Sequence, residues 1–451
     1  MTKALVLIGD DLRINDNPAL LNAMQNNDEI LVIYIYNQDY AGRPLGAASK
    51  VFLHHSLVSF CKLLKDSYNI DLLITTGNIS DVLQDVCNNY QFDEFYFNES
   101  YIKNYNDTLF DTKKFLSDNF KIQCNHFKAQ TLFSYGSIKN GSGEDFKVFT
   151  PFWKACLKNI DKIGQTLLAK DSKFAKQAKV SIQSLNIKDL GLLPTNQGNW
   201  HKEIAAHWTF DYKEIENNID DFINHKAKDY ANNRNLTYID GCSRLSPYFR
   251  FGLVSPRYVF NKVLASDSTS DQFLAELGWR EFAYHVAFVN PNLYQQELKT
   301  HFANFKWEEK GENLKAWQDG QTGFEIVDAG MKELYATGQM HNRVRMITAS
   351  FLIKDLLIDW KLGEQYFWDT LVDACPVVNP FSWQWVFGSG YDASPYFRIF
   401  NPDTQRERFD PDFIYCKKWL GEEYFDNLNM RIVNHSIQRG KAQRLYSLIQ
   451  Q

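Results

Sequence analysis

Short apolar runs alternate with longer amphipathic stretches through the first 130 residues. The short runs are rich in β-branched and aromatic residues, and most end in Gly, Asn or Ser, which predicts five strands at 3–9, 29–37, 71–78, 94–100 and 121–128. The longer stretches have helical spacing, which predicts helices at 18–27, 49–67, 79–90 and 105–119. Strands that alternate with helices indicate a doubly wound parallel sheet, so we predict an α/β fold for residues 1–130.

The first turn of this sheet argues against a dinucleotide fold. It reads GDDLRINDNP (9–18) and has no GxGxxG pattern. Two acidic residues stand where a pyrophosphate would need bare backbone amides. We therefore reject an NAD-binding interpretation of this half.

The pattern changes twice along the rest of the chain. Residues 131–200 are mixed, with a Gly/Ser-rich turn and a Lys-rich run, and we interpret them as an interdomain connection. From about residue 201 the helical period dominates, which predicts an all-helical domain over 201–451.

Composition restricts the function without naming it. The chain has 451 residues, a formal net charge of -5 and seven scattered cysteines, with no Cys/His cluster that would indicate a metal site. Scattered thiols, no signal-peptide pattern and no apolar run long enough to span a membrane predict a cytoplasmic protein. The net charge does not exclude DNA binding, because phosphate contact needs only a local basic patch.

Two predicted helices each place polar and aromatic groups on one face. In the first, Glu276, Trp279 and Arg280 are spaced i, i+3 and i+4; the second repeats this spacing in Asn342, Arg345 and Met346. Taken singly, each group is ordinary: Trp279 as a core residue, and Glu276 with Arg280 as a helical ion pair.

A third segment, at 371–390, carries four more such groups. Pro376 and Pro380 are expected to break a helix there and to present Asp373, Asn379, Trp383 and Trp385 around the break. Polar groups that interrupt apolar helices cost free energy unless they meet a ligand or one another. Together the three segments predict one cavity for a large planar, anionic cofactor beside a planar substrate.

Several long motifs of the helical half carry a family resemblance. They are YANNRN (230–235), GCSRLSPYFRFG (241–252), LGWREFAYH (277–285), MHNRVRMITASFLIKDLLIDW (340–360) and WQWVFGSGYDASPYFRIFNP (383–402). These segments resemble the FAD domain of the photolyase/cryptochrome family, and FTPFWKAC (149–156) and DDLRINDNPAL (10–20) look like its motifs elsewhere. The resemblance is closest to class I-like photolyases of cyclobutane pyrimidine dimers.

The resemblance implies a set of FAD-binding residues. Those matching the positions that hold the phosphates and ribityl chain are Tyr230, Cys242, Ser243, Arg244, Leu245 and Ser246. Those matching positions beside the isoalloxazine are Arg280, Arg345, Asp373, Cys375 and Asn379, with Arg345 and Asp373 as an ion pair and Asn379 toward flavin N5.

It also implies a substrate face, an electron relay and a DNA-binding rim. Residues similar to those that hold a flipped-out dimer are Glu276, Trp279, Asn342, Met346 and Trp385. The tryptophans matching the family's photoreduction chain are Trp383, Trp360 and Trp307, and the phosphate-clamping arginines are Arg234, Arg343 and Arg398. The (6-4) photolyases have a His pair in this region; only His341 is present here, which favours cyclobutane dimers.

Some positions depart from the family pattern. Cys375 stands where similar photolyases usually have Asp near the flavin, which predicts an altered flavin potential, and Cys242 replaces a usual Thr. In the α/β half, Gly9, Asp10 and Lys50 replace residues common in relatives, whereas Asn98 and Glu99 partly match a folate-contacting region. The sequence therefore leaves open whether there is an antenna chromophore, folate or deazaflavin.

The resemblance implies FAD as cofactor, UV-damaged DNA as partner, and light-driven splitting of cyclobutane pyrimidine dimers by a monomer with no protein partner. A blue-light receptor cryptochrome is the alternative; the chain ends at Gln451 without a long extra tail, which favours the enzyme. A relative that only binds nucleic acid is a third hypothesis.

Overall fold

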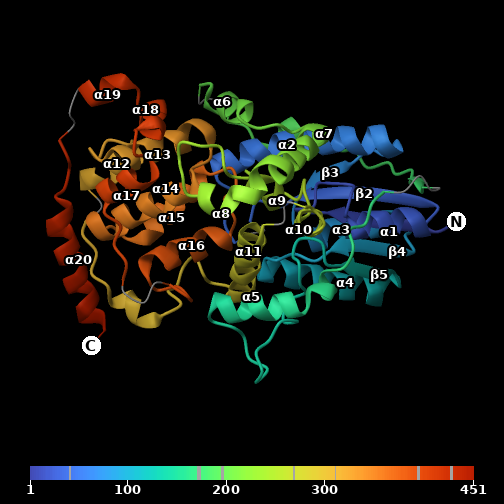
Figure 1. Cartoon of the computed structure of the whole chain (residues 1–451). Helices are drawn as coiled ribbons and strands as arrows, with labels where there is room; N and C mark the ends of the chain where they lie inside the picture. The colour runs from blue at the N-terminus through green and yellow to red at the C-terminus, as the bar shows by residue number, and fades with distance from the viewer. Residues whose placement is uncertain are drawn as a thin grey trace.

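The computed structural model describes residues 1–39, 42–169, 174–194, 198–267, 270–309, 311–393, 397–426 and 430–450. The part of the motif at 383–402 that falls on 394–396 lies outside these ranges. Strands gather at the N-terminal end of the molecule, and helices α12 to α20 form the opposite end, where the chain finishes (Figure 1).

The N-terminal part is a parallel sheet with helices between its strands, as predicted. The strands are β1 (Lys3–Ile8), β2 (Glu29–Tyr36), β3 (Leu73–Thr76), β4 (Glu94–Asn98), β5 (Gln123–Phe127) and β6 (Lys176–Gln177). The helices are α1 (Pro18–Asn26), α2 (Ala47–Tyr68), α3 (Ile79–Asn89) and α4 (Lys103–Phe120). The spatial order is β3-β2-β1-β4-β5, and every pairing is parallel.

Both faces of the sheet are buried at its centre, which explains why β1 and β2 are apolar almost throughout, whereas the edge strand β5 is more polar. Along β1, Ala4, Val6 and Ile8 enter one core with α1 and α2, and that core continues into the helical half. Leu5 and Leu7 point to a second core that holds residues of α3 and α4. The period of two along the strand therefore supplies two packed layers at once.

The segment at 131–200, predicted as a connection, carries structure of its own. Helix α5 (Phe149–Lys158) packs on α11 of the helical part. Strand β6, which the sequence pattern did not predict, pairs with the start of β2 in the registers Glu29↔Lys176 and Ile30↔Gln177. This segment therefore contacts both halves of the molecule.

The remainder of the described chain is helical, apart from loops. Its first α-helices are α6 (Trp200–Ala206), α7 (Tyr212–Asp221), α8 (Tyr230–Asn233), α9 (Ser246–Arg250), α10 (Pro256–Leu264), α11 (Asp271–Val289) and α12 (Gly311–Gln318). The later ones are α13 (Glu325–Thr337), α14 (Asn342–Ser350), α15 (Trp360–Thr370), α16 (Val378–Phe387), α17 (Pro402–Phe409), α18 (Ile414–Leu420), α19 (Glu422–Asp426) and α20 (His435–Ile449). Short 3-10 or π turns lie at Ile160–Ile163, Ile187–Leu190, Phe222–Lys226, Ala227–Asp229, Thr300–Asn304 and Phe351–Asp355.

One prediction about this half is wrong. Pro380 does not break a helix: it lies in the first turn of α16, whose first residue is Val378. A proline is tolerated there because the first-turn N–H groups have no partner within the helix. Of the two prolines, Pro376 lies outside a helix, in the turn before α16.

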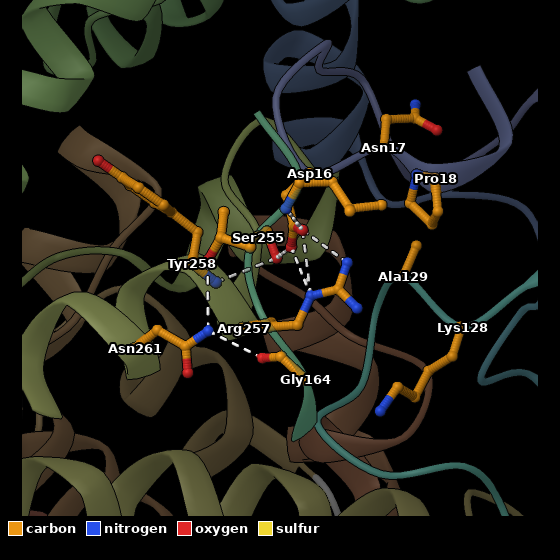
Figure 2. A network of polar contacts seen from close by, with 12 residues as sticks. Asp16, Asn17, Pro18, Lys128, Ala129, Gly164, Ser255, Arg257, Tyr258 and Asn261 are labelled. Atoms are coloured by element: carbon orange, nitrogen blue, oxygen red, sulfur yellow. Dashed lines mark hydrogen bonds and ion pairs between the residues drawn. The ribbon is translucent and has the colours of Figure 1, made fainter. Parts of the chain in front are cut away.

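A buried ion pair joins the two halves at the first turn of the sheet. The Asp16 carboxylate accepts hydrogen bonds from Arg257 Nε at 3.0 Å and Nη2 at 2.5 Å, from Ser255 Oγ, and from the Leu167 amide. Figure 2 shows these side chains converging from the N-terminal turn and from the start of α10. Nearby, Gly252 has φ +70°, and a Cβ there would lie 2.0 Å from the Asp10 carbonyl oxygen. The two halves are therefore in close backbone contact.

Candidate functional site

A cavity of about 810 Å³ opens among the helices of the C-terminal half. Its walls come from α8, α9, α11, α13, α14, α15, α16 and α18, together with the loops at 237–245, 339–341 and 371–375. This volume lies near the upper end of the range for small-molecule sites, so a ligand of cofactor size fits.

The cavity gathers most of the site residues predicted from the sequence. Those that line it are Tyr230, Arg234, Cys242, Ser243, Arg244, Leu245, Ser246, Glu276, Trp279, Arg280, Asn342, Arg343, Arg345, Met346, Asp373, Cys375, Asn379, Trp383 and Trp385. Trp360, Trp307 and Arg398 are not part of this lining. Segments far apart in the chain therefore meet on one surface.

An ion pair spans two of these segments. Arg345 on α14 reaches Asp373 with Nη1 and Nη2 at 3.1 Å and 3.0 Å, and Ser246 Oγ donates to the same carboxylate at 2.6 Å. This bidentate contact fixes the planes of the guanidinium and the carboxylate, so the ion pair gives this cavity wall a defined shape. In the adjoining loop, Arg244 has φ +53°, a conformation that a residue with a side chain adopts at some cost.

Arg280 has a hydrogen-bonding group left over. Its Nη1 donates to the Gln130 carbonyl at 2.8 Å, and its guanidinium lies 4.5 Å from the centroid of Tyr284. Its Nη2 is buried and has no hydrogen-bond partner among the described residues. A buried donor without an acceptor is costly, so this atom indicates a ligand that brings one.

Glu276 faces the cavity from α11 and pairs with Arg234, not with Arg280. Arg234 Nη1 lies 2.5 Å from Glu276 Oε1, and Gln272 Nε2 donates to the same oxygen at 2.8 Å. Arg280 is instead 3.5 Å from Glu281, so the helical ion pair considered from spacing does not form. Burial raises the pKa of Glu276, although Arg234 and Gln272 oppose the change. A carboxyl group so disposed takes up a proton more readily than an exposed one.

Two indoles form a partly exposed apolar surface of the cavity. Trp279 stacks on Phe149 of α5, with ring centroids 3.9 Å apart and planes at 11°. The Trp385 Nε1–H donates to the Asp392 carbonyl at 3.1 Å. Both side chains are half-buried, so the cavity is not closed to solvent at these positions.

The three relay tryptophans differ in burial. Trp383 lines the cavity and is 2 % exposed, Trp360 is fully buried and donates to Glu297 at 3.1 Å, and Trp307 is half-buried. The ring contacts of Trp383 are with Phe367 at 5.0 Å and Trp317 at 6.3 Å. Trp317 did not stand out in the sequence, because a lone buried tryptophan is usually part of the core.

Positive charge gathers at one side of the cavity. Burial, followed by the charges of Arg234, Arg408 and Arg398, lowers the pKa of Arg343 to about 10. Arg343 also donates to Asn235 Oδ1 at 2.7 Å, and Arg398 is exposed. Arg408, in α17, was not predicted, because nothing in the sequence distinguishes it from other arginines in helices. A local cluster of this kind suits a phosphate backbone despite the negative net charge.

Comparison with known proteins assigns the family. The model for the FAD binding domain of DNA photolyase matches residues 273–446, and the DNA photolyase model matches residues 4–171. The deoxyribodipyrimidine photo-lyase of Agrobacterium fabrum is 37% identical over 427 residues, which cover 93% of this chain and 87% of that protein. The chain belongs to the photolyase/cryptochrome family.

The chain is also similar to a cryptochrome and to a photolyase of known structure. Arabidopsis thaliana Cryptochrome-2 is 30% identical over 440 residues, covering 93% of this chain and 70% of that protein. The crystal structure of a class III photolyase from Agrobacterium tumefaciens superposes with a TM-score of 0.92 at 33% identity, covering 100% of this chain and 98% of that one. The expected closest likeness to class I enzymes is therefore corrected, because this structural relative is a class III photolyase.

The cavity fits the flavin that the family model names. It has enough volume and aromatic walls. It also presents the hydroxyl groups of Ser243 and Ser246 and the unpaired Nη2 donor of Arg280. Cys375, the departure from the family pattern, is 5% exposed, lines the cavity and lies 3.8 Å from the Tyr284 hydroxyl. A thiol with a tyrosine partner thus stands at the position where the resemblance implies a carboxylate.

Asp10, one of the departures in the α/β part, and the partly matching Asn98 and Glu99 all have partners within the protein. Asp10 pairs with Arg250 at 2.7 Å, and Asn98 Nδ2 donates to Asp11 at 2.5 Å and to Asn17 at 2.7 Å. Glu99 pairs with His126 at 2.8 Å. The cavity at this end of the sheet holds only about 30 Å³, far less than a folate or deazaflavin needs. This pocket therefore does not support an antenna chromophore, whose presence the sequence left open.

No helix among the described residues combines the length and the apolar character needed to cross a membrane. Nor does the described part of the chain hold a group of three His, Cys, Asp or Glu side chains placed to bind a metal ion.

Proposed function

We propose that this protein is a deoxyribodipyrimidine photo-lyase, which binds UV-damaged DNA and splits cyclobutane pyrimidine dimers in light. The observation that carries the proposal is one cavity whose walls present both the expected flavin contacts and the expected dimer contacts. The photo-lyase named among the relatives, at 37% identity, supports the same activity.

Residues from three regions hold FAD in this proposal. The loop and helix start at 242–246 bind its phosphates and ribityl chain, while Arg280, Arg345, Asp373, Cys375 and Asn379 surround the ring system. Bound FAD, in its reduced form, supplies the light-driven electron that opens the cyclobutane ring. The protein's own part is to bind, orient and shield.

The substrate side is built from Glu276, Trp279, Asn342, Met346 and Trp385. The two indoles offer an apolar slot for the pyrimidine dimer flipped out of the duplex, an extrusion that costs a few kcal/mol and less at a damaged step. Glu276 lines the cavity beside these indoles and is placed to hydrogen-bond the pyrimidine edge and to stabilise the charge that develops there.

Residues outside the flavin and dimer contacts transfer electrons and bind DNA in this proposal. Trp307, Trp360 and Trp383 carry electrons from the surface to the cavity wall, and Arg234, Arg343 and Arg398 contact DNA phosphates. We divide the chain into an α/β domain (1–130), a connection (131–200) and a helical domain (201–451). The proposal also includes a cytoplasmic monomer; the seven free thiols support the reducing compartment.

A repair assay tests the function. The reduced, flavin-loaded protein is mixed with thymine-dimer oligonucleotide and illuminated with blue light, and recovery of thymine absorbance is followed. We expect recovery that depends on light. Flavin binding and DNA binding without recovery would exclude the enzyme and leave the cryptochrome or binding-protein alternatives.

The matched variants are Glu276→Ala and Glu312→Ala. Glu276→Ala should lower repair per photon by up to about a hundredfold, the loss typical of one group that stabilises developing charge, with flavin content unchanged. Glu312 is exposed on α12 and outside the cavity lining, so its variant should repair normally. Equal repair by both variants would exclude the role given to Glu276.

A further inference from the structure

Asn379 is held by a carboxylate that lies behind the cavity wall. Its Nδ2 donates to Glu364 Oε1 at 2.8 Å and to the Glu364 carbonyl at 3.1 Å. An amide nitrogen carries two hydrogens, and these two contacts use both. Both acceptors lack hydrogens, so the flipped amide would set oxygen against oxygen. Only Asn379 Oδ1 is left to meet a ligand.

Glu364 is in turn held by an arginine from the other half of the molecule. Arg43 Nη1 lies 2.8 Å from Glu364 Oε2, and Nη2 lies 2.5 Å from Oε1. The Glu364 side chain is 2% exposed and the Arg43 side chain 17%. A forked, largely buried pair of this kind fixes the plane of the carboxylate as well as its position.

Arg43 is itself fixed on both sides. Its guanidinium lies 3.9 Å from the ring centroid of Trp368 and 4.9 Å from that of Tyr294. Trp368 Nε1 donates to the Pro44 carbonyl at 2.9 Å, and a Cβ on Gly46 would lie 1.9 Å from the Trp368 carbonyl oxygen. The segment before α2 is therefore seated tightly on α15.

We propose that Arg43 is a positioning residue that orients the Asn379 amide through Glu364, so that the cofactor meets a hydrogen-bond acceptor. Neither Arg43 nor Glu364 lines the cavity, so neither touches the ligand. This inference rests on the proposed flavin site. An acceptor at this place favours a cofactor state that presents an N–H there, so the arrangement sets the flavin's redox equilibrium.

The test measures the midpoint potential of bound flavin in Arg43→Met, Arg43→Lys and Ser49→Ala. Arg43→Met removes the fork, and we expect at least a threefold change in the one-electron equilibrium constant. Arg43→Lys keeps the charge but loses the planar fork, so its change should be smaller. Ser49 Oγ donates to the Leu371 carbonyl at 3.0 Å and joins α2 to the residue after α15 without touching Glu364, so Ser49→Ala should leave the potential unchanged.

A double variant separates positioning from general loosening. In an Asn379→Ala background, Arg43→Met should produce no further change in potential, because its route to the cofactor is gone. An unchanged potential in Arg43→Met with flavin bound, or equal shifts with and without Asn379, would overturn the proposal.

Two safeguards keep these outcomes separable. If Arg43→Met does not fold, Glu364→Ala takes its place, since it removes the side-chain acceptor that fixes the Asn379 amide; an unchanged potential there, with flavin bound, overturns the proposal as well. Failure of the unaltered protein to bind any flavin would instead refute the proposed function.

Discussion

The ammonium group of Lys354 is enclosed in the helical half, with the residue 1% exposed. Its Nζ donates to the Arg398 carbonyl at 2.5 Å and lies 4.4 Å from the centroid of Phe397. Burial, helped by Arg398 and opposed by Asp355, lowers its pKa to about 7. The lysine therefore couples stability to pH in a range where lysines normally do not titrate.

Comparing Lys354→Met with the unaltered protein tests this. Between pH 7 and about 10.5 the lysine is protonated in the unfolded chain and neutral in the folded protein. The free energy of unfolding therefore increases as the pH rises. In urea titrations, the unaltered protein should gain on the variant by up to about 1.4 kcal/mol per pH unit above pH 7. Parallel curves from pH 6.5 to 9 would mean that the lysine titrates normally.

Residue types at the cavity could be predicted, but several of their partners could not. Glu276, Arg280 and Asn379 stand out as polar groups in apolar helices, and the family motifs give them roles. The Arg234–Glu276 and Arg43–Glu364 pairs join positions 42 and 321 residues apart, a relation that only the fold creates. Spacing within one helix suggested Arg280 for Glu276, because local patterns favour local partners.

At the scale of elements, α15 and α16 meet at a glycine. A Cβ on Gly363 would lie 2.2 Å from Trp383 Cη2 and 2.5 Å from Leu352 Cδ2. The side chain that lines the cavity from α16 therefore owes its position to the absence of a side chain on α15.

Gly363→Ala should therefore destabilise the protein despite the better helix propensity of alanine. Overpacking costs about 1 to 3 kcal/mol, while alanine returns roughly 0.5 to 1 kcal/mol. The control is Gly440→Ala in α20, where nothing lies within 4 Å of the added Cβ, so the melting temperature should hold or rise. Equal melting temperatures for the two variants would mean that Trp383 is not held by this contact.

Long elements were predictable and short ones were not. The five predicted strands and the four helices between them appear where the pattern placed them. Strand β6 has two residues, too few to show any period, and its pairing depends on β2 lying beside it. The position of Pro380 was misjudged because the first turn of a helix accepts what its interior rejects.

At the scale of the whole molecule, the two halves meet across charges that are shielded from water. Asp16 is 1% exposed and the Arg257 side chain 10%. Removing one member of a buried pair leaves the other without compensation, at a cost of about 3 to 5 kcal/mol.

Asp16→Asn, which keeps the shape of the side chain, should lower the thermal unfolding midpoint of the full chain accordingly. The control is Asp71→Asn: Asp71 pairs with Lys65 on the exposed surface, where such pairs contribute about 1 kcal/mol or less. A loss from Asp16→Asn no larger than this control would show that the pair does not hold the halves together.

The order of strands and helices, and the change to an all-helical half, could be predicted because they follow from periodicity along the chain. The contact between the halves could not, because neither the missing GxGxxG pattern of the first turn nor its likeness to a family motif indicates which residues its acidic side chains bind. Its acidic residues bind arginines of the helical half instead: Asp10 binds Arg250 and Asp16 binds Arg257.

Strand β6 and the chain after it also run along the β2–β3 side of the sheet. The amides of Lys176 and Ala178 donate to carbonyls of Asp28 and Ile30, and that of Leu185 donates to Ile74 in β3, at 2.8 to 2.9 Å. An open strand border is a template on which a second polypeptide can add itself. This short segment therefore covers part of the sheet edge, so that less of the edge is free to pair with another copy of the chain and start aggregation.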